Sequence, residues 1–195
     1  MVNNMYSIEI MVEEHANICR MLKVVRKMCI GILEGEEVCD TDFRDVIDFI
    51  RNYADAYHHG KEEKFLFPEM VMKLGKVADN LITHGMLVEH NLGRSYVMAL
   101  ETALNQYKEN QITDHKLDII TSAMAYANLL EAHTEKENNA VYTYAERALK
   151  DDVKTEIDDE CHRFEENEES VLERTKYLEI LDKLENRYMK MSSSR

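Results

Sequence analysis

Hydrophobic and polar positions alternate with a helical period along most of the chain. Over residues 6–33 the apolar side chains recur every three to four positions and form one stripe, as in an amphipathic helix. The same period predicts three more long helices, over about 41–67, 77–108 and 113–148. Pro68 is expected to interrupt the second helix, because proline cannot donate the helical hydrogen bond.

Four long helices joined by short loops predict an all-α fold: an up-down-up-down antiparallel four-helix bundle with additional C-terminal helices. We expect the bundle to occupy residues 1–150 and an acidic helical extension to occupy residues 151–195, with a frayed tail. Residues 151–170 carry ten acidic and two basic side chains, which is typical of a solvated helix on the outside of a bundle. The helix after it has an apolar stripe that needs a partner, either the bundle or a second subunit in a homodimer.

Composition and charge narrow the class of protein. The 195 residues include only six glycines and one proline, which agrees with long helices. The formal net charge of −14 argues against nucleic acid and membrane surfaces as partners. No apolar run reaches the roughly 18 residues of a membrane span, and the N-terminal segment lacks the features of a signal peptide. We therefore expect a cytoplasmic protein with reduced cysteines.

A repeated motif on the second and fourth predicted helices carries the candidate chemistry. The segment HHGKEEKFLF, which begins at His58, matches HTEKENNAVY, which begins at His133. The shared pattern is H-x-x-K-E-x(3)-apolar-aromatic, and its glutamates are Glu62 and Glu137. A histidine and a glutamate four residues apart project from the same face of a helix, where they can bind a metal ion.

The repeat also chooses between two neighbouring pairs on the second helix. His58/Glu62 and His59/Glu63 are both spaced by four residues, but position 63 is matched by Asn138 in the other copy. We therefore expect His58 and Glu62 to be ligands. His59 and Glu63 lie about 100° around an ideal helix, where they would support the ligands or face solvent. The lysines of the two motifs are expected to face outward.

The first and third helices each contribute one histidine from their apolar side. VEEH ends at His15 and LVEH ends at His90. A single histidine in an apolar stripe is usually a core residue, and a single HxxxE pair is usually a surface ion pair. Two buried, unpaired carboxylates would cost several kcal/mol each, however, and bound metal removes this cost. Imidazole and carboxylate together suit iron, manganese or zinc.

The combined pattern of His15, His58-x(3)-Glu62, His90 and His133-x(3)-Glu137 resembles the hemerythrin-like family, also called the HHE cation-binding domain. The resemblance covers about residues 6–148. It implies a four-helix bundle around two iron ions, an oxo- or hydroxo-bridged di-iron centre. By this resemblance the four histidines would be terminal ligands, and the two glutamates would bridge the ions.

One position departs from the oxygen-carrying members of that family, which have a further histidine four residues before the third-helix histidine. Here that position is Met86. His84 lies six residues before His90, about 120° around an ideal helix. It could be a metal ligand only if the helix is distorted, for which Gly85 offers a means, and otherwise it faces outward. The departure argues against reversible O2 carriage.

We therefore expect a non-haem di-iron protein that binds or reacts with O2, peroxide or NO, using an external electron donor if it turns over. Iron storage or donation and a gas-sensing module without catalytic turnover are the alternatives, and the sequence leaves open whether the protein is an enzyme. Four tyrosines are either hydrogen-bond donors around the site or ordinary core residues: Tyr53, Tyr57, Tyr126 and Tyr142.

Overall fold

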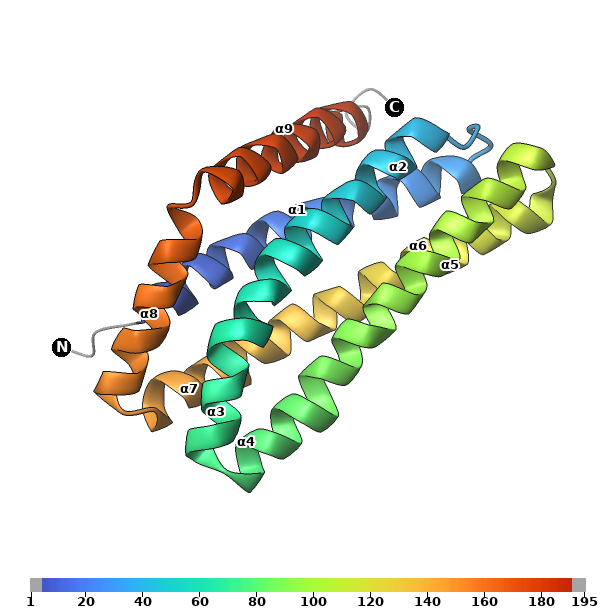
Figure 1. Cartoon of the computed structure of the whole chain (residues 1–195). Coiled ribbons are helices and arrows are strands. Elements are labelled where there is room, and N and C mark those ends of the chain that lie inside the picture. Colours follow the sequence, from blue (N-terminus) through green and yellow to red (C-terminus); the bar gives the residue numbers. More distant parts are fainter. Residues whose placement is uncertain (1–4, 191–195) are drawn as a thin grey trace.

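Four long helices run antiparallel to one another in the computed structural model, which describes residues 5–190 (Figure 1). The first bundle helix is α1 (Tyr6–Leu33). The others are built of consecutive segments. The second bundle helix consists of α2 (Asp40–Phe49), η1 (Ile50–His59), η2 (Glu62–Leu66) and α3 (Phe67–Leu74). The third consists of α4 (Lys76–Leu81), η3 (Ile82–Met86) and α5 (Leu87–Glu109). The fourth consists of α6 (Thr113–Lys136), η4 (Glu137–Val141) and α7 (Tyr142–Ala148). The C-terminal tail and the first four residues of the N-terminal segment lie outside the described residues.

The predicted bundle is confirmed, and its connections follow the local sequence. The described residues form helices and no strand. Gly35 (φ 96°) lies in the loop after α1, and Gly75 (φ 71°) makes the turn between α3 and α4; both have the positive φ that glycine adopts most easily. Gly93 of α5 packs against α6, where a Cβ would make an ordinary van der Waals contact 3.4 Å from Leu130 Cδ2.

Short π-helical segments, labelled η, occur in both copies of the repeated motif and change the backbone hydrogen bonding there. The N–H of Phe67 bonds to the carbonyl of Glu62, and the N–H of Tyr142 bonds to that of Glu137, each five residues back. Such a turn holds an extra residue and rotates the side chains that follow it.

The prediction that Pro68 interrupts the helix was wrong. Pro68 lies in the first turn of α3, where a missing N–H is tolerated.

Two apolar cores stand on either side of a layer of buried polar side chains. Along α1, Ile8 and Met11 belong to one core, and Ile18 and Leu22 belong to the other, with His15 between them. The other three bundle helices divide in the same way. The core toward the end of the bundle where α3 meets α4 also receives α8 (Asp151–Glu165). The polar layer is therefore held from both sides by close-packed apolar groups.

The C-terminal extension covers the bundle rather than standing away from it (Figure 1). Residues Val153, Ile157 and Cys161 of α8 are buried in one core. α9 (Glu168–Lys190) runs beside α1 and buries Tyr177 and Leu181 in the other core. Of the two predicted partners for its apolar stripe, the structure thus shows the bundle. No helix in the described part of the chain is long and apolar enough to cross a membrane.

Candidate metal centre

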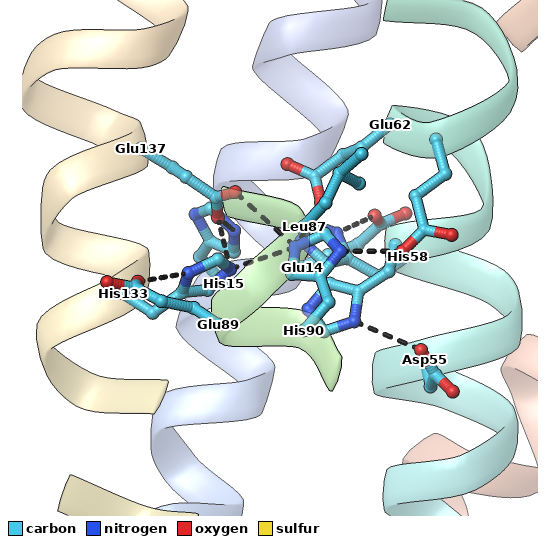
Figure 2. Close-up of polar contacts among 12 residues, drawn as sticks. Glu14, His15, Asp55, His58, Glu62, Leu87, Glu89, His90, His133 and Glu137 are labelled. Atoms are coloured by element: carbon cyan, nitrogen blue, oxygen red, sulfur yellow. Dashed lines mark hydrogen bonds and ion pairs between the residues drawn. The ribbon is translucent and has the colours of Figure 1, made fainter. Parts of the chain in front are cut away.

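The polar layer contains six of the seven side chains that the sequence singled out. They are His15, His58, Glu62, His90, His133 and Glu137, and each is at most 2% exposed. Figure 2 shows these side chains converging from the bundle helices toward one region. The structure does not bring His84 to this region. Although the π-helical segment η3 distorts the helix at Gly85, His84 remains exposed at the surface, and the layer is formed without it.

Potential ligand atoms fall into two adjacent groups. One is formed by His15, His58, Glu62 and Glu137, and the other by His59, His90 and His133; within each group the ligand atoms lie within 4.8 Å of one another. Glu137 Oε2 lies 3.2 Å from the Nε2 atoms of both His15 and His133, so this carboxylate reaches both groups. Glu62 Oε2 lies 3.9 Å from His58 Nε2 and 3.6 Å from His90 Nε2. Both glutamates therefore lie between the groups.

Sequence reasoning missed His59, which completes the three-histidine group. The side chain is 5% exposed, and its ring stacks on that of His90 with centroids 3.7 Å apart. The expectation that it supports the ligands or faces solvent assumed an ideal α-helix, whereas residues 50–59 are π-helical. The repeat pointed away from it as well, since the other copy has Thr134 at this position. The doublet of adjacent histidines was the one signal in the sequence.

Each histidine of the layer is oriented by a polar partner on its Nδ1 atom. The pairs are His15 with Asn138 (2.8 Å), His58 with Glu14 (2.8 Å), His59 with Asp55 (3.2 Å), His90 with Glu63 (2.7 Å) and His133 with Glu89 (2.9 Å). Because a carboxylate or amide oxygen accepts, Nδ1 carries the proton and donates. Nε2 is then left with its lone pair toward the layer, as in metal-binding histidines.

Several polar atoms in the layer have no hydrogen-bond partner, and their chemistry shows whether a cation would fit among them. His58 Nε2, Glu62 Oε2 and both carboxylate oxygens of Glu137 are buried and make no hydrogen bond. The Nε2 atoms of His90 and His133 face each other at 3.1 Å. Nitrogen lone pairs and carboxylate oxygens that converge without donors suit positive ions bound among them. The residues present therefore fit a metal centre.

The electrostatics of the layer agree with this. Burial and the nearby charge of Glu137 raise the pKa of Glu62 well above its ordinary value. Burial opposes the charged form of Glu137 too, but contacts with His133, His15 and His90 outweigh it and hold the pKa of Glu137 well below its usual range. Burial disfavours charged His90, yet contacts with Glu137 and Glu63 prevail and raise its pKa. Burial and the neighbouring histidines lower the pKa values of His58 and His59. Without a bound ion, protons therefore favour Glu62, His90 and His133 over these two rings.

Tyrosines surround the layer in different roles. Tyr142 donates to Glu62 Oε1 (2.6 Å), and its hydroxyl lies 3.5 Å from His15 Nε2. Tyr57 donates to Glu165 of α8 at 2.7 Å, and the hydroxyl of Tyr53 accepts from Asn17. Tyr126 is buried in one of the apolar cores, beside α5. Tyr142 is thus the one of these four that contacts the proposed ligands.

The geometry defines a class of protein: a helical bundle with buried histidine and glutamate clusters that bind cations. Residues 6–145 match the family described as the hemerythrin HHE cation binding domain. The chain belongs to this family, and the resemblance seen in the sequence is confirmed. No curated protein and no solved structure matched the chain.

Proposed function

We propose that this protein binds two iron ions in the polar layer and that the centre reacts with O2, peroxide or NO. The observation that carries the proposal is the pair of adjacent ligand groups, together with Glu62 and Glu137, each of which lies 3.2–3.9 Å from histidine Nε2 atoms of both groups. In this assignment His15 and His58 hold one ion, and the three-histidine group holds the other. When bound, two iron ions supply redox chemistry and a position at which a small molecule can bind.

The number of donors supports iron rather than zinc. Three histidines and two shared carboxylates offer one ion five protein donors, whereas zinc usually takes four in a tetrahedral site. Mixed imidazole and carboxylate donors suit iron and manganese. The other ion receives two histidines and the same two carboxylates, which is one donor fewer. The side of His15 and His58 is therefore where we expect a small molecule to bind.

The hydroxyl of Tyr142 lies on that side of the layer. It is fully buried, and burial together with the charge of Glu62 raises its pKa well above the ordinary value, so it keeps its proton. Phe67 occupies the equivalent position of the repeat, beside His90, and has no hydroxyl to donate. The two-histidine side thus has a phenol that is hydrogen-bonded to the proposed ligand Glu62, holds its proton and can orient a small polar molecule.

A cavity of about 120 Å³ between η1 and α5 lies beside the three-histidine group and supports access by small molecules to that half of the layer; its lining includes neither His15 nor His58. Its lining includes Ile50, Gly93 and Val97 together with the two stacked imidazoles of His59 and His90. Such a space admits molecules of a few atoms and excludes large substrates. Electrons for any turnover would come from an external donor, and we propose neither nucleic acid nor membrane as a partner.

Metal analysis with absorption spectroscopy tests the proposal. We expect two iron ions per purified chain and ligand-to-iron charge-transfer bands in the near ultraviolet. Anaerobic reduction should bleach these bands, and addition of O2, hydrogen peroxide or NO to separate samples should restore or replace them. One zinc ion per chain, or no metal, would refute the iron assignment. Two iron ions whose spectrum is unchanged by all three molecules would refute the proposed reactivity.

A further inference from the structure

A buried network of charges joins the C-terminal extension to the centre of the bundle. Lys61 is fully buried, although an outward position was expected, and its Nζ donates to Glu14 and to Glu165 Oε1, the latter at 2.6 Å. Glu165 is the last residue of α8 and is itself 7% exposed. It also accepts from Tyr57 (2.7 Å) and from Arg174 of α9 (2.7 Å).

The network continues to a proposed metal ligand. Glu14 receives Lys61 on Oε1, and its other oxygen, Oε2, lies 2.8 Å from His58 Nδ1. Contacts thus run without a break from Arg174 through Glu165, Lys61 and Glu14 to His58. Partners behind a ligating histidine fix the orientation of its ring and its basicity.

The internal repeat contains the same arrangement without the extension. His133 donates to Glu89, and Glu89 also binds Lys136, so histidine, glutamate and lysine are linked in both copies. The side chain of Lys136 is 49% exposed, however, whereas that of Lys61 is 0% exposed. Water can solvate Lys136. The ammonium of Lys61 has Glu165 in the place of water.

Charge balance shows what Glu165 does there. A buried ammonium needs compensating negative charge, since water cannot reach it. With two carboxylates on Lys61, Glu14 shares the cation with Glu165 and keeps one oxygen for His58. Without Glu165, the ammonium would be balanced by Glu14 alone, and the hydrogen bond from His58 to Glu14 would weaken.

We propose that Glu165 is a positioning residue for the metal centre, which acts through Lys61 and Glu14 on His58. The C-terminal extension thereby supports the two-histidine ion selectively. This inference rests on the proposed metal site. It adds that residues outside the family match at 6–145 control one half of that site.

The test compares the release of the two ions to a chelator from the full chain and its variants. Glu165→Gln keeps the shape of the side chain and an acceptor for Tyr57 but removes the charge. We expect it to speed the release of the ion held by His15 and His58 about tenfold, which is within the range for partners of metal-bound histidines. The release of the ion held by the three-histidine group should be unchanged. The charge-transfer bands should shift as well.

Asp158→Asn is the matched control, because Asp158 also lies on α8 and also ties it to the bundle, through Ser7. It contacts no member of the network, so both release rates should remain those of the parent. If Glu165→Gln and Asp158→Asn release metal alike, Glu165 has only a docking role and the inference is wrong.

A double-mutant comparison tests the route through Lys61. In a Lys61→Met background, Glu165→Gln should no longer change the release rate, because the group through which it acts is gone. A full tenfold effect in that background would overturn the inference. If the parent chain binds no pair of ions, the proposed function fails instead, so the two failures are distinguishable. Circular dichroism of each metal-free variant confirms that it is folded.

Discussion

At the scale of single residues, the adjacent histidines His58 and His59 belong to different groups of potential ligands. His58 faces the group with His15, and His59 faces the group with His90 and His133. Each donates from Nδ1 to its own acidic partner, Glu14 and Asp55 respectively, so the two rings are held independently. Two neighbouring residues on one helix can therefore belong to two ions.

We expect His59→Ala to weaken the binding of one iron ion by at least about tenfold, because it removes one of three imidazoles from the same ion. His84→Ala is the control, since that side chain is exposed and lies outside the layer. Iron content after dialysis against a weak chelator measures both. Equal iron retention in the two variants would show that His59 is not a ligand.

At the scale of elements, the helices were predictable and the π turns were not. Apolar periodicity placed the first helix at residues 6–33, as observed, because burial of one stripe depends on a 3.6-residue repeat. A π turn holds one extra residue, and the 3.6-residue period of the apolar positions does not reveal it. The internal repeat predicted that His58/Glu62 and His133/Glu137 would act together, and the structure places both pairs in the polar layer. The inward position of His59 depends on the π-helical turns, and the burial of Lys61 depends on α8; no local pattern reveals either.

The two C-terminal helices were also only partly predictable from the sequence. The acidic run of α8 predicted a solvated helix, and most of it is exposed, but Glu165 at its end is buried as a partner of Lys61. α9 was predicted from its apolar stripe, and the choice of the bundle as its partner required the structure.

Leu181→Ala on α9 should destabilise the protein by about 3 kcal/mol, because this fully buried side chain would leave a cavity against the bundle. Leu172→Ala, on the same helix but 71% exposed, should change stability by less than about 0.5 kcal/mol. Urea unfolding followed by circular dichroism measures both. A small effect at Leu181 would mean that α9 does not stabilise the bundle, as would be the case if it detached in solution.

At the scale of the whole molecule, the polar layer interrupts what would otherwise be one continuous apolar core. Glu62 and Glu137 are fully buried there, and the unpaired atoms of the layer are costly when no ion is bound. The cores on either side hold the layer in place, so the ligands are arranged before metal arrives. A bound ion then adds stability that grows with the logarithm of its free concentration divided by its Kd.

Removal of metal should therefore lower the thermal midpoint. Free iron at about a thousand times its Kd would stabilise the folded state by about 4 kcal/mol, which corresponds to roughly 10 °C for a chain of this size. Differential scanning calorimetry of the chelator-treated and reloaded protein measures the shift. A midpoint that does not depend on metal would contradict the ligand assignment as a whole.

The position of the layer between two cores also has a consequence for assembly kinetics. Each of the four bundle helices contributes residues to both cores, and each also supplies at least one of the proposed ligands. The complete set of proposed ligands comes together only when all four helices have paired, so we expect metal to bind late in assembly. We therefore expect metal to be loaded into the folded bundle, through local opening of the helices around the layer or through the cavity beside His59 and His90.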